Sequence, residues 1–151
     1  MPSAAKQQRL HRAEERSAGG VVVKDDEVLV IVPKRRAASG STVLGLPKGH
    51  IDGVETAQEA ATREVREEGG VEVDLIEPLG DVRYRYRRGG ALVDKRVSFF
   101  LFRYRSGSPE DHDHEILEAR WMALSEAART LTYAGERTMV ERALSKMSGD
   151  R

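Results

Sequence analysis

The apolar positions in the first quarter of the chain form two short, nearly continuous runs. Residues 17–24 contain Val21, Val22 and Val23, and residues 27–32 are dominated by Val, Leu and Ile. Asp25 and Asp26 separate the runs and predict a turn. Runs of this kind are typical of strands that are buried on both faces of a sheet. We therefore expect two paired central strands, the second of which ends at Pro33.

A second pattern predicts a helix from Glu55 to Glu68. This stretch contains three alanines and several Glu and Arg residues, which favour helix formation. Gly69 and Gly70 follow it directly, and glycine commonly ends a helix at its C-terminus.

Alternation of apolar and polar residues dominates the next part of the chain. Residues 71–76 alternate as a half-buried strand should, and residues 81–87 alternate more strongly. Residues 88–91 include two glycines and predict a turn, after which residues 92–105 predict a long returning strand. We expect a β-hairpin with one arginine-rich face and one aromatic face.

The last part of the chain predicts two helices. Ser125 is a candidate N-cap for a short first helix. A final amphipathic helix is expected to reach Met147, with core positions at the helical period at Met139, Val140, Ala143, Leu144 and Met147. We find no internal repeat or linker. The expected organisation is a flexible or loosely helical extension over residues 1–17, one domain over residues 18–147 and a tail over residues 148–151.

Composition limits the classes of function. The 151 residues suit one domain, and with 39% hydrophobic and 33% charged residues the chain is expected to be soluble and globular. No apolar run is long enough to span a membrane, and no secretory signal is evident. The absence of cysteine excludes disulfides and thiol chemistry, and it is compatible with the cytoplasmic location that we expect. Lys+Arg and Asp+Glu both total 25, so charge gives no sign of general nucleic-acid binding.

The predicted helix carries the candidate chemistry. Glu64, Glu67 and Glu68 stand at i, i+3 and i+4, so their carboxylates share one helical face and repel one another. Arg63 and Arg66 can offset part of this repulsion. A hard divalent cation held by carboxylate oxygens would offset more of it.

Residues 49–71 read G-x5-E-x7-R-E-U-x-E-E-x-G-U, where U is an aliphatic residue (Val65 and Val71). This pattern resembles the Nudix box, so the protein is identified as resembling the Nudix hydrolase family. The resemblance implies an α/β fold, in which an α/β/α sandwich surrounds a mixed β-sheet and carries a loop–helix–loop. It also implies divalent-metal-dependent hydrolysis of a nucleoside diphosphate linked to a further group X.

The resemblance assigns roles within the box. Glu67, Glu68 and the backbone carbonyl of Gly49 are implied metal ligands for Mg²⁺ or Mn²⁺, and Glu64 is implied as a metal ligand or as the general base. Arg63 is implied to orient a glutamate through an ion pair. For Glu55 we expect a structural role.

A second acidic site is implied ahead of the last strand. Glu115 stands six residues before Trp121, which resembles the family position from which a glutamate approaches the metal across the cleft. Glu115 is therefore a candidate metal ligand or alternative base, and Glu118, one turn further on, is its competitor. We interpret His112 and His114 as parts of a polar loop, because Mg²⁺ prefers oxygen ligands.

The substrate is predicted from residues outside the helix. Residues 46–50, Leu-Pro-Lys-Gly-His, resemble the diadenosine polyphosphate hydrolase branch of the family. We expect Lys48 to contact phosphate, whereas His50 is either a loop residue or a substrate contact. Arg83 is either a phosphate ligand or part of a solvated face, and Tyr84 and Tyr86 either stack on a base or pack in the core.

The expected substrate is a small-molecule dinucleoside polyphosphate. The alternatives are a house-cleaning nucleoside triphosphate diphosphatase of the 8-oxoguanine type, an RNA 5′-pyrophosphohydrolase, and a nucleotide sensor without catalysis. We expect no membrane partner, and either a monomer or a homodimer is compatible with the sequence.

Overall fold

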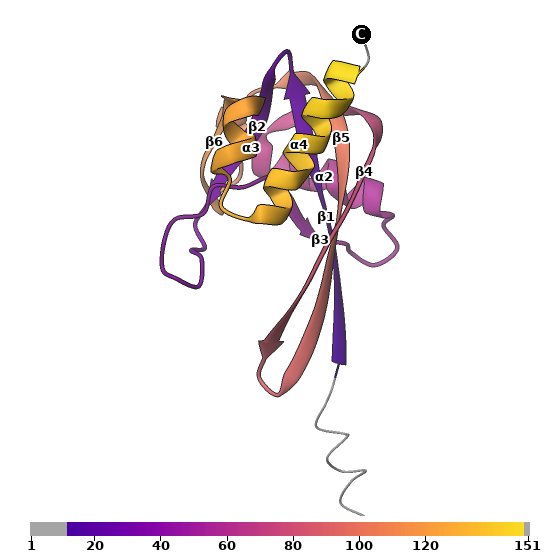
Figure 1. Ribbon diagram of the computed structural model, residues 1–151, viewed down its shortest axis with the longest axis vertical. Coiled ribbons are helices and arrows are strands. Elements are labelled where there is room, and N and C mark those ends of the chain that lie inside the picture. Colours follow the sequence, from indigo (N-terminus) through magenta and orange to yellow (C-terminus); the bar gives the residue numbers. More distant parts are fainter. Residues whose placement is uncertain (1–11, 150–151) are drawn as a thin grey trace, which may run out of the picture.

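The computed structural model describes residues 12–149 and contains a six-stranded sheet in the order β4-β5-β1-β2-β6, with β3 paired to β1 (Figure 1). The elements in chain order are β1 (Arg12–Lys24), β2 (Glu27–Pro33), β3 (Lys48–His50), α2 (Ala57–Gly69), β4 (Val71–Arg88), β5 (Ala91–Gly107), the short 3₁₀ helix η1 (Pro109–Asp111), β6 (Ile116–Ala123), α3 (Leu124–Thr130) and α4 (Ala134–Gly149). Within the described residues, no helix is both long enough and apolar enough to cross a bilayer.

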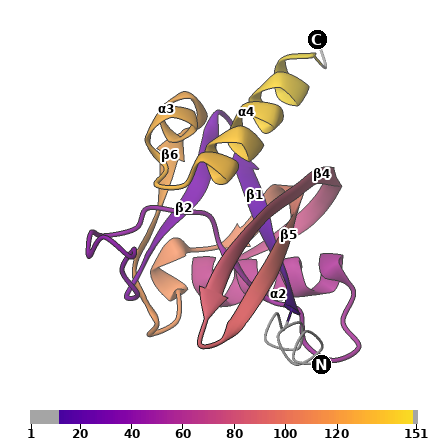
Figure 2. The same cartoon turned by 60° about the horizontal axis from the view of Figure 1, so that its bottom comes forward.

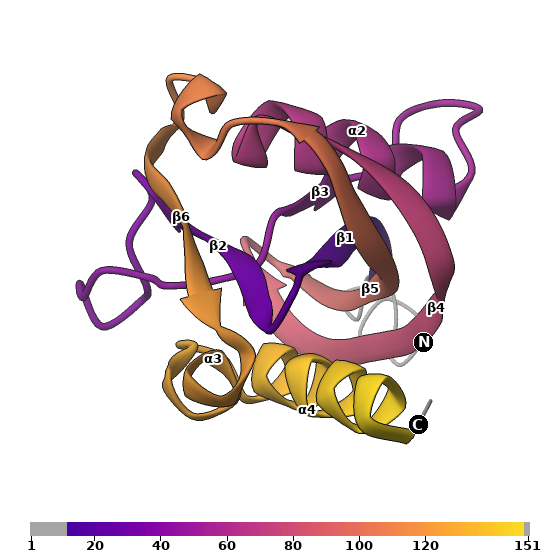
Figure 3. The same ribbon diagram turned by 90° about the horizontal axis from the view of Figure 1, so that it is seen from above.

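The sheet is mixed and is covered by helices on both faces. β1 and β5 are parallel, whereas β1 pairs antiparallel with β2 and β3, and β4 pairs antiparallel with β5. Seen from above, α2 lies on one side of the sheet, and α3 and α4 lie on the other (Figure 3). This arrangement confirms the predicted α/β/α sandwich around a mixed sheet.

The two faces of β1 explain its continuous apolar run. Ala18 and Val22 pack in the core cluster that includes residues of α2, whereas Val21 and Val23 pack in the cluster that includes residues of α3 and α4. Because successive side chains of a strand point to opposite faces, a strand between two helical layers needs apolar residues at every position.

Local signals define α2. The Thr56 hydroxyl accepts the Glu59 N–H at 3.1 Å, and the Glu59 carboxylate accepts the Thr56 N–H at 2.8 Å, which forms a capping box. The helix ends before Gly70, whose φ of 76° is readily adopted only by glycine. The predicted helix is therefore confirmed, although it begins two residues later than expected because Thr56 caps it.

The predicted hairpin is also confirmed. β4 and β5 are 18 and 17 residues long and are joined through Gly89 and Gly90. β4 is one continuous strand with irregular register near residues 72–80, where we expected two separate strands. The far part of the hairpin extends beyond the helical layers together with the start of β1 (Figure 1). Figure 2, in which this end comes forward, shows β4 and β5 side by side.

The expected boundary at residue 17 is wrong for residues 12–17. These residues form the first part of β1, which pairs with β5 from Arg12 opposite Leu92 onward. The strand is stabilised by a ladder of backbone hydrogen bonds to a partner some 80 residues away, and by an ion pair of Glu15 with Lys95. Residues 1–11, the rest of the expected extension, lie outside the described residues.

Two boundaries near the C-terminus also differ from expectation. α3 is capped by Ala123 without a side-chain hydrogen bond, so the expectation for Ser125 is wrong. The Leu124 N–H donates to the Asp26 carbonyl at 2.9 Å, which begins the helix directly after β6. α4 continues to Gly149, so residues 148 and 149 are helical rather than part of a tail.

Candidate active site

A cleft of about 1180 Å³ lies between the Nudix-box residues and the extended hairpin. Most of the candidate site residues line it: Lys48, Gly49, His50, Glu64, Glu67, Glu68, Tyr84, Tyr86 and Glu115. The cleft thus has acidic groups from α2 and basic and aromatic groups from β3, β4 and β5.

Arg63 lies behind the acidic wall and connects its members. Its guanidinium binds Glu55 through two hydrogen bonds, from Nε at 2.7 Å and from Nη2 at 3.0 Å. Its Nη1 donates to Glu64 at 2.9 Å and to Glu67 at 3.3 Å. Arg63 therefore makes the ion pairs that an orienting role requires, and it holds Glu64 and Glu67 from one guanidinium.

Glu55 ties the preceding loop to α2. Besides its two bonds to Arg63, Glu55 accepts the Asp52 N–H at 2.9 Å, and Arg63 donates to the His50 carbonyl at 2.9 Å. The Arg63 hydrogen bond, followed by the Asp52 N–H, lowers the pKa of Glu55 to about 2. These contacts are those of a loop anchor, which agrees with the structural role expected for Glu55.

Glu64 is the most buried of the three glutamates, with its side chain 11% exposed. Burial raises the pKa of Glu64, and the charge and hydrogen bond of Arg63 oppose that rise. A Cβ at position 49 would overlap the Glu64 carboxylate. Gly49 therefore leaves the space in which this carboxylate lies against the β3 backbone.

Glu68 stands over the start of β3. It accepts the Lys48 N–H at 2.9 Å. Burial is the largest influence and raises the pKa of Glu68 to about 8, although the Lys48 N–H lowers it, and the charges of Glu64 and Asp113 raise it further. A charged Glu68 is thus costly in this arrangement without an additional cation.

The donor set fits a hard divalent cation. Glu64, Glu67 and Glu68 offer carboxylate oxygens, and Gly49 offers a backbone carbonyl, which are the ligands that Mg²⁺ and Mn²⁺ prefer. Across residues 12–149, no three acidic, His or Cys side chains already converge as a metal site. Arg63 holds two of the carboxylates and the Lys48 N–H holds the third, so binding would require these side chains to turn toward the cation.

Glu136 is a site residue that the sequence analysis missed. It lies on α4, is 4% exposed, and its carboxylate contacts Lys48 Nζ at 2.9 Å while accepting the Leu46 N–H at 2.9 Å. The charge of Glu136 helps to raise the pKa of Lys48 against the opposing effect of burial. A signal was present, because Glu136 precedes Met139, Val140 and Ala143 on the buried helical face.

The hairpin side of the cleft carries a row of polar and aromatic side chains. Tyr84 lies opposite Lys95, and Lys95 lies opposite Glu15 in the strand register. The Tyr86 hydroxyl donates to Glu15 at 2.7 Å, and Arg88 contacts the same carboxylate at 2.7 Å. Tyr84 is 48% exposed and available to a ligand, whereas the Tyr86 hydroxyl is engaged.

Ser17 adds a buried hydroxyl to the cleft lining. It is 2% exposed, and its Oγ has no hydrogen-bond partner among residues 12–149. A buried hydroxyl without a partner is costly, so a ligand or water in the cleft is the expected partner. In the sequence, Ser17 stands where the expected extension meets the first predicted strand, and no role was predicted for it.

The structure distinguishes the two candidates for the second acidic site. Glu115 lines the cleft, and its N–H donates to the Asp113 carboxylate at 3.0 Å. Glu118 lies on β6 opposite Val32, pairs with Arg120 at 3.1 Å and does not line the cleft. The placement therefore favours Glu115 over Glu118.

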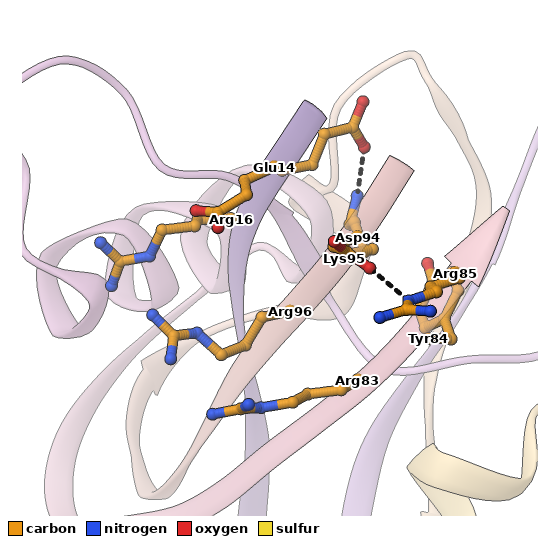
Figure 4. Close-up of a pocket in the computed structure, with 9 residues that line it drawn as sticks. Glu14, Arg16, Arg83, Tyr84, Arg85, Asp94, Lys95 and Arg96 are labelled. Carbon is orange, nitrogen blue, oxygen red and sulfur yellow. Dashed lines mark hydrogen bonds and ion pairs between the residues drawn. The ribbon is translucent and has the colours of Figure 1, made fainter. Parts of the chain in front are cut away.

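Arg83 is not brought into the cleft. Arg83 alternates with Tyr84 and Tyr86 along β4 and lines a second hollow (Figure 4), which borders the cleft at Glu15, Tyr84 and Lys95. Arg88 lines the cleft instead. Of the hairpin residues that the sequence analysis considered for substrate binding, Tyr84 and Tyr86 therefore line the cleft and Arg83 does not.

The NUDIX domain family matches residues 14–143. The chain therefore belongs to the Nudix family, whose hydrolases act on pyrophosphate bonds. A relative from Mycobacterium tuberculosis (strain CDC 1551 / Oshkosh), named putative mutator protein MutT4, is 38% identical over 102 residues, which are 68% of this chain and 41% of the relative. The chain thus spans less than half the length of this curated relative.

Solved structures have the same fold. A Nudix hydrolase from Nitrosomonas europaea superposes with a TM-score of 0.71 at 20% identity, covering 88% of this chain and 90% of that one. An Ap4A hydrolase from C. elegans superposes with a TM-score of 0.66 at 20% identity, covering 89% of this chain and 98% of that one. A MutT Nudix hydrolase from Burkholderia pseudomallei superposes with a TM-score of 0.66 at 26% identity, covering 85% of this chain and 97% of that one.

Proposed function

We propose that this protein hydrolyses the phosphoric anhydride bond of a nucleoside diphosphate linked to X, with a dinucleoside polyphosphate as the first-choice substrate. The observation that carries the proposal is the cleft itself, in which three glutamates of α2 face a wall of basic and aromatic side chains. Such a cleft fits a polyanionic nucleotide that is bound together with a divalent cation.

The proposed cation is Mg²⁺ or Mn²⁺, held by Glu64, Glu67, Glu68, the Gly49 carbonyl and Glu115. When bound, the cation would neutralise phosphate charge and lower the pKa of an attacking water. The protein supplies the positions of these ligands through the contacts of Arg63 and through the space at Gly49.

Glu64 is our choice for the base that takes the proton of the attacking water. Arg63 holds its Oε2, which leaves Oε1 to accept a proton. Glu64 also lines the cleft in which the attacking water would lie, as a general base must. Glu115 is the alternative base, since it lines the same cleft from a different element.

Lys48 is our choice for a phosphate contact. Lys48 lines the cleft, and its Nζ is held by Glu136 and lies 5.8 Å from the centre of the Tyr133 ring. A lysine held in this way stays charged and in place, so a phosphate of the substrate can share it with Glu136. His50 lines the same wall and is a second candidate.

The dinucleoside assignment is supported by the exposed ring of Tyr84, which can stack on a base at the hairpin side of the cleft. One structural neighbour is named an Ap4A hydrolase, and the curated relative is named a mutator protein. A mononucleotide substrate therefore remains the second candidate.

A substrate panel tests this proposal. The panel contains diadenosine tetra-, penta- and hexaphosphates, ordinary and 8-oxo nucleoside triphosphates, ADP-ribose and a 5′-triphosphate RNA, each with Mg²⁺, with Mn²⁺ and with a chelator. Fastest turnover of a dinucleoside polyphosphate, lost with chelator, supports the proposal. Preference for a mononucleotide or for RNA reassigns the substrate. Nucleotide binding without any product would make the protein a sensor and contradict the proposal.

A further inference from the structure

Three arginines lie side by side on adjacent strands, away from the cleft. Arg16 of β1 is opposite Arg96 of β5, and Arg96 is opposite Arg83 of β4. Adjacent strands are about 4.8 Å apart, and like charges directly opposite one another destabilise a sheet. Figure 4 shows that the three guanidinium groups extend to the same side of the sheet.

Neighbouring carboxylates leave most of this charge uncompensated. Asp94 is engaged by Arg85 at 2.6 Å and by Arg12 at 3.4 Å. Asp81 is 3.9 Å from Arg96, at the limit of an ion pair. Across the described part of the chain, Arg16 and Arg83 make no ion pair with a carboxylate, although Glu14 lies in the same hollow.

The row lines a hollow of about 520 Å³ on the β4–β5–β1 extension. Five of its lining residues are cationic and three are acidic. Its arginines alternate along the strands with Tyr84, Lys95 and Glu15, which form the next cross-strand row. These three residues border both the hollow and the catalytic cleft, whereas the three arginines line only the hollow. Successive side chains of a strand point to opposite faces. The two rows therefore occupy opposite faces of the same strands.

We propose that Arg16, Arg83 and Arg96 bind a di- or triphosphate anion on the face of the sheet opposite the catalytic cleft. Guanidinium groups bind phosphate oxygens through paired, charge-assisted hydrogen bonds. A chain of two or three phosphates can lie along the row, so that each guanidinium meets an anionic oxygen and the repulsion between the arginines is removed. The ligand is either free inorganic diphosphate or the diphosphate group of a nucleotide.

Calorimetric titration of the full chain with inorganic pyrophosphate, without divalent metal, tests this inference. Arg83→Gln and Arg96→Gln are expected to bind pyrophosphate at least tenfold more weakly than the unchanged protein. Arg87→Gln is the matched control, because Arg87 is on the same strand and the same face but is opposite Leu92. It is expected to bind pyrophosphate as the unchanged protein does.

Two further measurements separate this site from the cleft and from a folding defect. Lys48→Gln removes a proposed phosphate contact of the cleft, and Lys48 does not line the hollow. The pyrophosphate binding that is weakened in Arg83→Gln is therefore expected to be retained in Lys48→Gln. Without ligand, Arg83→Gln is expected to have an equal or higher Tm, because a repulsive charge is removed, and pyrophosphate should raise its Tm less than that of the unchanged protein.

Several results would overturn the proposal. An equal loss of affinity in Arg87→Gln would show general charge attraction only. Loss in Lys48→Gln with retention in Arg83→Gln would place the anion in the cleft. A single-stranded oligonucleotide that binds more tightly than pyrophosphate, in a manner dependent on the three arginines, would reassign the row to nucleic acid. If the arginine row is confirmed as the binding site, equal affinities for ADP and pyrophosphate would show that the diphosphate group alone is recognised. Tighter binding of ADP would show that the ligand is a nucleotide.

Discussion

Arg63 holds five groups in place at the residue scale, one of which is Asp52, with an ion pair at 3.4 Å. The other four, which accept hydrogen bonds from its guanidinium, are Glu55, Glu64, Glu67 and the His50 carbonyl, at distances from 2.7 to 3.3 Å. A lysine has the same charge but cannot form the two parallel bonds to Glu55 while also reaching Glu64. The geometry of this residue, beyond its charge, is therefore expected to matter for catalysis.

Replacement of Arg63 by lysine tests that expectation. We expect Arg63→Lys to lower kcat by about 10- to 100-fold, as is typical for groups that orient metal ligands, with the fold retained. The measurement is steady-state kinetics on the best substrate of the panel. Arg66→Lys is the matched control, because Arg66 pairs with Glu72 at the surface, and an equal loss in both variants would contradict the orienting role.

Gly49 is expected to be essential because of the space that it leaves. Gly49→Ala would force the Glu64 carboxylate out of its position, and a displacement of about 1 Å can cost about 100-fold in rate. We expect this loss together with weaker Mg²⁺ binding, measured by activity against metal concentration. Gly90→Ala is the control, since no atom lies within 4 Å of a Cβ there. Full activity of Gly49→Ala would show that catalysis does not depend on the observed position of the Glu64 carboxylate.

Glu136 is expected to stabilise the fold through Lys48. Removing one partner of a buried ion pair costs about 3–5 kcal/mol, and Lys48 is 25% exposed, so the lower end of this range applies. We expect Glu136→Gln to lose about 3 kcal/mol of unfolding free energy in urea, whereas Glu141→Gln on the exposed face of α4 should lose almost none. A loss below about 0.5 kcal/mol would mean that Lys48 finds another partner.

The three strands of the extension are held together by one carboxylate at the element scale. Glu15 of β1 accepts the Tyr86 hydroxyl of β4 and pairs with Arg88 and Lys95. The Tyr86 hydrogen bond is the largest cause that lowers the pKa of Glu15, to about 2 from 4.5. These contacts join β1, β4 and β5 next to the cleft.

A pH dependence of stability follows from this pKa. Because the folded-state pKa of Glu15 is depressed, its contribution is present above pH 4.5 and is lost as the pH falls toward 2. We expect the difference in unfolding free energy between the unchanged protein and Glu15→Gln to shrink across this window. This difference is measured by denaturant unfolding at pH values from 6 to 2, and Glu141→Gln, which replaces an exposed glutamate, is the control variant. A difference that does not change with pH would contradict the role of the Glu15 charge.

The sequence predicted the elements that depend on local signals. α2 could be predicted because a run of helix-forming residues ends at Gly69 and Gly70. The β4–β5 hairpin could be predicted because apolar and polar residues alternate on both sides of Gly89 and Gly90. The start of β1 at Arg12 was missed, because this polar segment becomes a strand only through its distant parallel partner β5. The helical period placed Met139 in the core, and the same period would have placed Glu136 on that buried face, although nothing in the sequence showed that its partner is Lys48.

The cleft is a property of the whole molecule, because its walls come from distant parts of the chain. α2 supplies the box glutamates, the loop before β6 supplies Glu115, and the hairpin supplies Tyr84 and Tyr86. The box pattern in the sequence predicted the first wall. Alternation along the hairpin predicted that the arginines and the tyrosines lie on opposite faces. It could not predict that the tyrosine face, rather than the face of Arg83, lines the cleft, because that depends on how the hairpin packs against distant parts of the chain.

The central claim is that the glutamates of α2 support metal-dependent hydrolysis, and Glu68→Gln tests it most directly. The measurement is product release with Mg²⁺ and with Mn²⁺, compared with the unchanged protein and with Glu141→Gln, after circular dichroism has shown that all three are folded. The account predicts a loss of turnover of about 100-fold or more in Glu68→Gln, with no change in Glu141→Gln. Turnover by Glu68→Gln close to that of the unchanged protein would contradict the assignment of the metal site.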